Sequence, residues 1–331
     1  MTAVPSPTGT PASGNAEHPE VSICLITYNH APFIRRAIEG VLAQEKPFTW
    51  ELIIAEDCST DGTREIVRTY AEQDPAHVRL ILPPANTGAM VWVDLMAAAR
   101  GRWVAYLDGD DYWTDPRKLV KQREFLLAHP DSSIVAHTMR VLDQASGRFL
   151  ADHGPGSAKQ WFDLDDLVER GTFFCNSSVM YRGDALPPEG PDRGATHVGD
   201  WLFHMQAAQH GRIGFLNERM GVYRSMPTSR SASNRRDVDG ALGDLLYSLD
   251  RAKSFGASAG AVQRGAARAH FVMAVSALEH GNFPVFRREI DASAEAGPRI
   301  STMQRLLIAL RRSPTVARTV IRAYARASRQ R

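Results

Sequence analysis

The chain has 331 residues, of which 44% are apolar and 23% are charged, as in an ordinary globular protein. Its formal net charge of +2 gives no general attraction for nucleic acid, and no apolar run approaches the ~20 residues needed to cross a bilayer. The 3 cysteines lack the spacing of a metal site, so we expect reduced thiols and a cytoplasmic protein.

The N-terminal segment 1–20 is rich in Pro, Ser, Thr, Gly and Ala. It has neither the basic start nor the apolar centre of a signal peptide. Because such a composition cannot bury enough apolar surface to fold, we expect a disordered leader over 1–20.

From residue 21 to about 140, apolar runs typical of buried strands alternate with segments of helical periodicity. The first run, 21–27 (VSICLIT), precedes Pro32, which is well placed to open a helix. Further strands are expected at 50–55, 78–82 and 103–107, with helices that begin after Asp61 as a cap, at 86–88, and at Asp115. The alternation predicts an α/β fold with a parallel sheet that helices cover on both faces.

From 141 to 235 the pattern is less regular, with frequent Gly and Pro and short apolar runs. Such a segment usually forms the rim of a pocket. From 240 onward the periodicity is helical. We therefore expect a body over 21–235, in halves 21–140 and 141–235, followed by a helical extension over 240–331.

Three acids, Asp108, Asp110 and Asp111, directly follow the expected strand 103–107. Open α/β sheets bind ligands at the carboxyl ends of their strands. Neighbouring carboxylates repel each other unless a cation joins them, and a divalent cation that holds a diphosphate would do so. The alternative is an acidic turn, because Asp and Gly are ordinary turn residues.

A second acidic turn, Glu56-Asp57, follows the expected strand 50–55. In a parallel sheet both turns lie at the same edge. One turn can then hydrogen-bond a nucleobase while the other holds the metal and the ribose. Two such turns on one edge favour a nucleotide site over two unrelated turns.

This ordered combination resembles glycosyltransferase family 2, whose members have the nucleotide-sugar-binding A-type fold. The similarity covers about 21–230. The matching segments are 27–29 (TYN), 56–63 (EDCSTDGT), 86–88 (NTG), 107–113 (LDGDDYW) and 199–201 (GDW). The resemblance implies a Rossmann-like nucleotide-diphospho-sugar transferase fold, with a mostly parallel central sheet flanked by helices.

The resemblance also implies a donor site. Thr27, Tyr28 and Asp57 would contact the nucleobase, which is usually uracil in this family. Asp110 and Asp111 match the positions that contact ribose and bind Mg²⁺ or Mn²⁺. Asp108 is a third candidate for the metal. The other residues expected in the nucleotide-sugar site are Asn29, Glu56 and Asn86.

For the acceptor side, Asp200 matches the general base that deprotonates the acceptor hydroxyl. Trp201 and Arg224 are expected to contact the acceptor or the diphosphate. The residues expected near the acceptor are His137, Asn176 and Arg182.

The implied function is an inverting, metal-dependent glycosyltransferase. It would move a sugar from a nucleotide-diphosphate donor, expected to be a UDP-sugar, to a hydroxyl of a saccharide or lipid-linked acceptor in cell-surface polysaccharide or glycan synthesis. The alternative is a catalytically silent nucleotide-sugar-binding protein of the same fold. Many relatives have a His where this chain has Met226, and a thioether is a poor partner for a hard cation. His197 and His204 could substitute, although a packing role is favoured for both.

The tail has no acid after Glu295. In its last helix the arginines share one face and an apolar set shares another: Arg318, Arg322 and Arg326, and Val316, Val320 and Tyr324. One interpretation is peripheral contact of 300–331 with the anionic inner face of the membrane. The other is a helix packed on the catalytic domain with a solvated arginine face.

Overall fold

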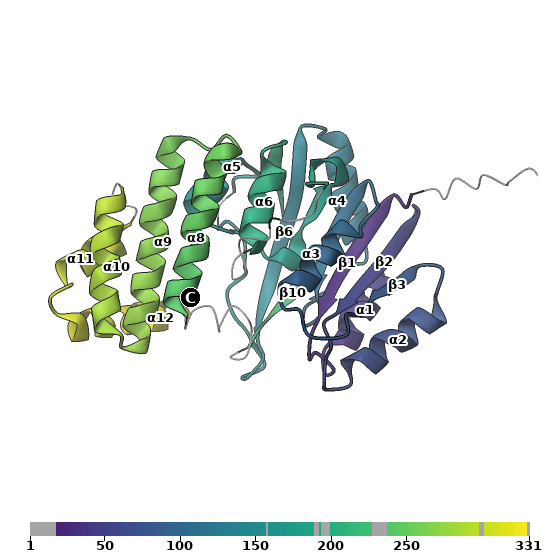
Figure 1. Cartoon of the computed structure of the whole chain (residues 1–331), viewed down its shortest axis with the longest axis horizontal. Coiled ribbons are helices and arrows are strands. Elements are labelled where there is room, and N and C mark those ends of the chain that lie inside the picture. The colour runs from purple at the N-terminus through teal and green to yellow at the C-terminus, as the bar shows by residue number, and fades with distance from the viewer. Residues whose placement is uncertain are drawn as a thin grey trace, which may run out of the picture.

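The computed structural model describes residues 18–156, 158–188, 192, 199–226, 237–297 and 301–329, without the side chains of 325–329. An α/β body occupies one end of the molecule and a stack of helices the other (Figure 1). Residues 1–17 of the expected leader lie outside the described residues.

The first half of the body forms four parallel strands in the order β3-β2-β1-β4. Their bounds are β1 (Val21–Thr27), β2 (Trp50–Glu56), β3 (Val78–Ile81) and β4 (Trp103–Asp108). These bounds confirm the strands expected from the apolar runs. The runs are apolar throughout because both faces are covered: Ile23 and Leu25 face one hydrophobic cluster, and Cys24 faces the other.

Helices cover both faces of this sheet. One face packs against α1 (Ile34–Leu42), α2 (Thr63–Gln73) and α4 (Lys118–Ala128), which contribute Ile38, Val67 and Leu119. The other packs against α3 (Met90–Ala97) and α6 (Gly199–Ala208), which contribute Leu95 and Phe203. The α/β prediction is confirmed.

Three helix starts differ from expectation. The turn 86–88 precedes α3, which begins at Met90, and Asp115 precedes α4, which begins at Lys118. In α2 the N-cap is Gly62, with a left-handed φ of 91°, in place of Asp61. Asp61 still accepts hydrogen bonds from the Thr63 and Ala31 amides, so it ties this turn to the loop after β1.

The second half of the body is more regular than its sequence suggests. Two long parallel strands, β6 (Ser132–Asp143) and β10 (Arg212–Ser225), extend the sheet, and the short antiparallel β9 (Met180–Arg182) joins them to β4. β10 escapes detection because its polar stretch 217–219 interrupts the alternation where the register with β6 shifts. The minor elements are β5 (Tyr112–Trp113), β7 (Arg148–Phe149), β8 (Trp161–Phe162), α5 (Leu164–Arg170), and the 3-10 turns η1 (Asn176–Ser178) and η2 (Gly183–Ala185).

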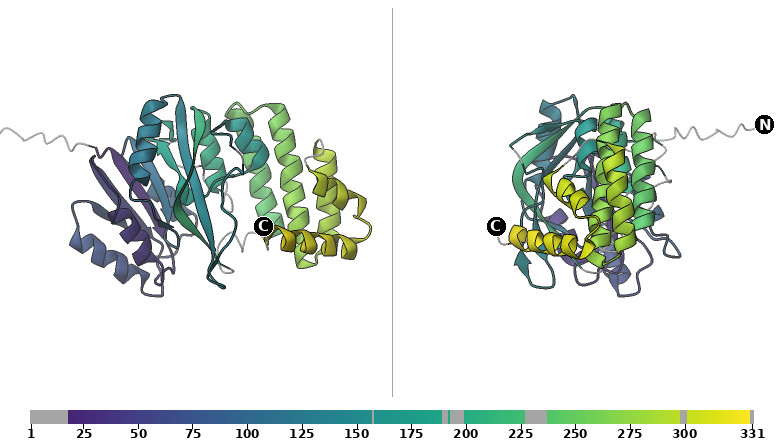
Figure 2. Two further views of the ribbon diagram at one scale, coloured as in Figure 1. Left: turned by 180° about the vertical axis from the view of Figure 1, so that it is seen from behind. Right: turned by 90° about the vertical axis from the view of Figure 1, so that its left-hand side faces the viewer.

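The helical extension is joined to the body by a shared core. Its helices are α8 (Val238–Ser254), α9 (Ala259–His280), α10 (Phe283–Ala296), α11 (Thr302–Ala309) and α12 (Pro314–Arg329). α8 and α9 pack with α5 and α6 in one hydrophobic cluster, whereas α9 to α12 form a separate one farther out (Figure 2). Close approach of α9 requires Gly265, since a Cβ there would lie 2.7 Å from the Val168 carbonyl oxygen.

A buried lysine side chain lies at the start of α4. The Lys118 side chain is fully buried, and its Nζ is 3.7 Å from the ring centroid of Trp113. No hydrogen-bond partner for this Nζ exists among the described residues. Burial lowers the pKa of Lys118 well below its usual value, because the charged form is desolvated.

We expect Lys118→Met to raise the free energy of unfolding at pH 7 by about 1–3 kcal/mol, since an apolar chain of similar length removes the desolvation cost. At pH 7 the unfolded chain carries a proton on Lys118 that burial disfavours in the folded state. The free energy of unfolding of the wild type therefore rises as the pH approaches the usual lysine pKa. Over the same range the stability difference between Lys118→Met and the wild type shrinks. Urea denaturation at pH 7 and pH 10 measures both effects. Destabilisation at pH 7 would show that the contact with Trp113 outweighs the desolvation.

Candidate active site

The acid cluster lies at the carboxyl end of β4, against the end of β1. The Gly109 amide donates to the Ile26 carbonyl oxygen over 2.7 Å. A Cβ at Gly109 would lie 2.7 Å from Thr27 Oγ1, so only glycine allows this approach. The flanking carboxylates of Asp108 and Asp110 are thereby brought beside Thr27.

The three carboxylates have different surroundings. Asp111 is 1% exposed, and its oxygens accept hydrogen bonds from Ser177 Oγ (2.6 Å) and the Arg224 amide (2.8 Å). Asp108 accepts from the Tyr106 hydroxyl over 2.8 Å. Asp110 has only its own amide as a recorded donor among the described residues. Asp111 is thus held by the protein itself, and its expected role as a metal ligand stays a prediction.

Asp108 and Asp110 share an uncompensated charge. Burial raises the pKa of Asp108 to about 7, and repulsion from Asp110 adds to the rise. Burial also raises the pKa of Asp110 to about 6, against the opposing effects of its own amide and of the Arg224 charge. Two hard oxygen donors in this state suit a divalent cation, which would neutralise both.

The 3-10 turn η1 connects this cluster to Asp200. Ser177 Oγ accepts from the Asp108 amide over 3.1 Å and donates to Asp111. Asn176 Nδ2 donates to Asp200 Oδ2 over 2.7 Å. The Ser177 carbonyl in turn accepts from Trp113 Nε1 over 2.8 Å, which fixes the turn. Ser177 is the site residue that the sequence analysis missed; the only signal is a polar triplet inside an apolar run, 173–181.

Asp200 begins α6. Its Oδ1 accepts from the Trp201 amide over 2.9 Å, in the first turn of the helix, where a negative charge is favourable. Trp201 itself is 4% exposed and its Nε1 donates to the Leu167 carbonyl over 3.1 Å. The prediction that Trp201 contacts a ligand is therefore wrong, because its ring belongs to the core.

The other residues expected near the acceptor lie in different parts of the structure. Asn176 lies at Asp200, as described above. In the register of β9 with β4, Arg182 lies opposite Trp103, at the end of β4 away from the acids. His137 is fully buried within β6. Neither of these two can reach an acceptor at Asp200. His197 lies outside the described residues.

Arg224 lies beside the acids. Its side chain is held between the rings of Phe33 and Tyr112, with its guanidinium carbon 5.0 and 4.8 Å from their centroids, and Nη1 donates to Gln144. Burial lowers the pKa of Arg224, opposed by the nearby acids. Its Nε has no partner among the described residues, so a donor remains available toward the site.

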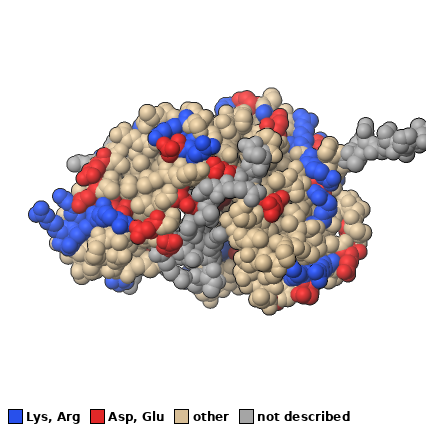
Figure 3. Space-filling model, in the orientation of Figure 1, with Lys and Arg blue, Asp and Glu red and all other residues tan. Residues whose placement is uncertain are grey.

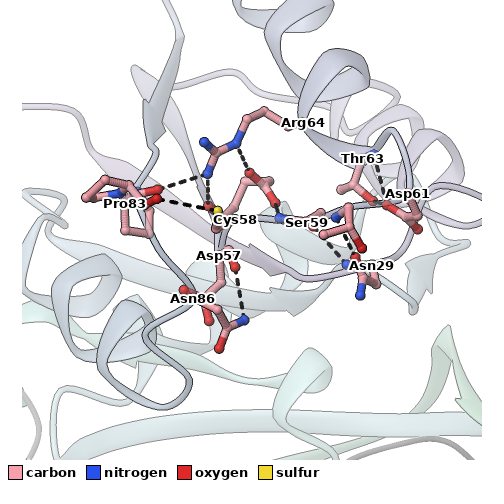
Figure 4. Close-up of polar contacts among 12 residues, drawn as sticks. Asn29, Asp57, Cys58, Ser59, Asp61, Thr63, Arg64, Pro83 and Asn86 are labelled. Atoms are coloured by element: carbon pink, nitrogen blue, oxygen red, sulfur yellow. Dashed lines mark hydrogen bonds and ion pairs between the residues drawn. The ribbon is translucent and has the colours of Figure 1, made fainter.

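The second acidic turn is held by its own hydrogen bonds (Figure 4). Glu56 is fully buried, pairs with Arg64 and accepts from the Ser59 amide. Asp57 accepts from the amides of Thr87 (2.7 Å) and Gly88 (2.8 Å) and thus clamps the loop before α3. Glu56, predicted to bind nucleotide, instead supports the turn.

Asn29 and Asn86 also hold loops together. Asn29 has a left-handed φ of 53°, and its Oδ1 accepts from the Thr60 amide over 2.9 Å. Asn86 Nδ2 donates to the Asp57 carbonyl over 3.0 Å. The free groups nearby are Tyr28, which is 43% exposed, and Thr27 Oγ1, which is buried without a partner among the described residues. Of these two, the Tyr28 ring is exposed, whereas the Thr27 hydroxyl is shielded by the surrounding protein.

Comparison with known proteins identifies the family. The family model "Glycosyl transferase family 2" matches residues 22–183. A protein of Bacillus subtilis named "Putative teichuronic acid biosynthesis glycosyltransferase TuaG" is 41% identical over 220 residues, which are 65% of this chain and 82% of TuaG. The chain belongs to glycosyl transferase family 2. An uncharacterized protein of Mycobacterium tuberculosis is 39% identical over 206 residues. This match spans 62% of the present chain and only 58% of that relative's length.

Solved structures share the family 2 fold. Residues 1–349 of S. aureus TarS, in complex with UDP-GlcNAc, superpose with a TM-score of 0.66 at 18% identity, covering 93% of this chain and 92% of that one. The mannosyltransferase PcManGT from Pyrobaculum calidifontis, in complex with GDP-Man and Mn²⁺, gives a TM-score of 0.57 at 18% identity, covering 95% and 88%. The nucleotide-sugar transferase fold predicted from the sequence is confirmed.

We expect the stability of the metal-free chain to fall as pH rises from about 4 to about 7 through the acid pair. The folded state keeps protons on Asp108 and Asp110 that the unfolded chain has already lost, given their pKa values of about 7 and about 6. Asp110→Asn removes one charge and its repulsion of Asp108. The variant should therefore be more stable than the wild type at pH 7.5 in EDTA, with a flatter pH dependence.

Urea titrations at pH 5 and pH 7.5 measure this difference. Asp250→Asn is the control, because Asp250 is exposed on α8 and pairs with Lys253 there. An Asp110→Asn chain with the wild-type pH dependence would contradict the electrostatic account.

Proposed function

We propose that this chain transfers a sugar from a nucleoside-diphosphate donor, a UDP-sugar, to a hydroxyl of a saccharide or lipid-linked acceptor in cell-surface polysaccharide synthesis. The observation that carries the proposal is the placement of Asp200 beside the pair Asp108 and Asp110, through adjacent residues of η1. One carboxylate pair suits a metal diphosphate, and a third carboxylate suits a proton acceptor. The names of TuaG and of the TarS complex with UDP-GlcNAc support this assignment.

On the donor side, the nucleobase would lie at the carboxyl end of β1. The buried Thr27 hydroxyl and the exposed Tyr28 ring supply a hydrogen bond and a stacking surface. Asp57 Oδ2 accepts one recorded hydrogen bond, from Gly88, so it can accept a second from a base N–H. Arg224 faces the diphosphate.

The metal, Mg²⁺ or Mn²⁺, is assigned to Asp110 and Asp108. We prefer this pair to Asp111, because Ser177 Oγ lies closer to Asp111 Oδ2 (2.6 Å) than to Asp108 Oδ2 (3.3 Å), and the Arg224 amide also donates to Asp111. Among the described residues no group of three or more His, Cys, Asp or Glu side chains could hold a metal. A cation here would therefore take its remaining ligands from the diphosphate and water. When bound, it supplies neutralisation of the charge that grows on the leaving group.

The proposed reaction inverts the anomeric carbon. The acceptor oxygen forms a bond to that carbon from the face opposite the diphosphate, the bond to the phosphate oxygen breaks, and Asp200 takes the acceptor proton. The hydrogen bonds from Trp201 and Asn176 hold the carboxylate in place for this transfer. A positioned base contributes ~10²–10⁴-fold, or roughly 3–5 kcal/mol.

The second candidate is a catalytically silent nucleotide-sugar-binding protein. Met226 favours it, since this residue replaces the histidine of many relatives. The retained Asp110 and Asp200 favour the enzyme. Binding of a nucleotide sugar without turnover, over a full panel of donors and acceptors, would establish the silent protein.

We expect Asp200→Asn to lower turnover by about 10²–10⁴-fold and to leave Mn²⁺-dependent donor binding intact, because only the proton acceptor is lost. Thermal shifts with a panel of UDP- and GDP-sugars, with Mn²⁺ or EDTA, select the donor, and release of the nucleoside diphosphate measures turnover. Asp184→Asn, in η2 at the far end of the sheet, is the control. Turnover of the Asp200→Asn chain near the wild-type rate would refute the base assignment.

The membrane contact of the tail stays a prediction. α12 packs Ala317 and Ile321 into the outer cluster, and Arg318 donates to the Glu279 carbonyl. Val316 and Tyr324 remain 52% and 60% exposed. Lys and Arg side chains gather at the end of the molecule where α10 and α11 lie (Figure 3). No helix among the described residues is long and apolar enough to cross a membrane.

If the tail contacts membranes, the full chain should float with vesicles that contain anionic lipid, and a chain without 313–331 should not. Binding should weaken with added salt, since the attraction is electrostatic. Equal flotation of the two chains would exclude this role for the tail.

A further inference from the structure

We propose that a buried chain of hydrogen bonds, from Tyr181 through His204 and Asn176, positions the carboxylate of Asp200. The proposal rests on the proposed role of Asp200 as the base. Under it, His204 and Tyr181 are positioning residues that touch neither donor nor acceptor.

The contacts form one continuous path. The Tyr181 hydroxyl is 2.8 Å from His204 Nδ1, and His204 Nε2 is 2.9 Å from Asn176 Oδ1. Asn176 Nδ2 is 2.7 Å from Asp200 Oδ2. The four residues come from β9, α6 and η1, so the path joins three elements. His204 is 1% exposed and Tyr181 is 2% exposed, so water does not supply their partners.

The direction of each hydrogen bond follows from the chemistry of the groups. An ionised carboxylate only accepts, so Asn176 must turn its NH₂ toward Asp200. Its Oδ1 then accepts, and His204 must carry its proton on Nε2. His204 Nδ1 is left as an acceptor for the Tyr181 hydroxyl. Every donor therefore points toward Asp200, an arrangement in which successive hydrogen bonds strengthen one another.

Burial keeps His204 in this single neutral form. It lowers the pKa of His204 to about 4, although the Asp200 charge opposes the shift. The ring also packs against Phe174, with centroids 4.9 Å apart, so it cannot turn over freely. A fixed tautomer fixes the orientation of the Asn176 amide, whose two ends would otherwise be interchangeable in shape.

A packing role alone does not require these groups. A phenylalanine would fill the space of the His204 ring, whereas a buried imidazole is costly unless both nitrogens are paired. Here both are paired, and the path ends at Asp200. With Trp201 N on Oδ1 and Asn176 on Oδ2, the carboxylate is anchored at both oxygens.

The test compares His204→Phe with His204→Gln. His204→Phe breaks the path at two points, so we expect kcat to fall about 10–100-fold, with the donor KM unchanged. The acid limb of the kcat/KM profile should move to higher pH, because the Asn176 amide, no longer held by His204, can turn away and cease to donate to the anionic base. His204→Gln offers an amide donor and an acceptor at similar positions and should recover most of the rate. Tyr181→Phe, which removes only the last hydroxyl, should lower kcat by a few fold.

The matched control is His270→Phe. His270 lies on α9 and its Nδ1 is 2.7 Å from Glu289 Oε2, so the same change breaks a buried contact away from the site. The control should lose stability and keep the wild-type kcat and pH profile.

The outcomes separate the two proposals. Wild-type kcat and pH profile in a folded His204→Phe chain would overturn the positioning role, and so would a His204→Gln chain no better than His204→Phe. If His204→Phe does not fold, Tyr181→Phe decides by the same readouts. Full activity of Asp200→Asn would instead remove the base assignment itself, whatever the histidine variants do.

Discussion

The arrangement of the site depends on holding like charges together at one edge of the sheet. Asp108, Asp110 and Asp111 repel one another, and burial makes each charge more costly. Hydrogen bonds from the Ser177 hydroxyl and the Arg224 amide to Asp111 offset part of this cost. The remaining repulsion stays on Asp108 and Asp110, and in the proposed function a divalent cation bound with the donor diphosphate would relieve it.

The turn η1 is where this constraint meets the rest of the fold. Asn176 and Ser177 are adjacent in sequence, yet one contacts Asp200 and the other contacts the acid cluster. The turn is itself fixed by Trp113, and Gln122 Nε2 of α4 donates to the Ser178 carbonyl over 2.8 Å. A shift of η1 would therefore displace both the acid cluster, Asp108 to Asp111, and Asp200. In the proposed mechanism, donor activation and proton removal would both depend on the position of this one short element.

The first helices of the C-terminal extension pack into the core of the α/β body and do not form a separate domain. α8 and α9 share their hydrophobic cluster with α5 and α6, and α6 carries Asp200 and His204. The packing behind α6 therefore supports the side of the site where an acceptor would bind. The outer cluster of α9 to α12 is joined to the inner one through α9 and lies farther from the site.

The sequence by itself determined the order of strands and helices in 21–140 and the meeting of two acidic turns at one edge. Apolar runs and helical periodicity report burial directly, and parallel strands bring their carboxyl ends together. It could not distinguish acids that face a ligand from acids that hold the protein, because that depends on side-chain direction. Glu56 thus proved to be a supporting residue and Trp201 a core residue, whereas the role of Asp111 toward a metal stays a prediction. Only the tertiary structure brought Ser177 and Tyr181 to the site and showed what His204 contacts, since their partners lie far along the chain and leave no local pattern.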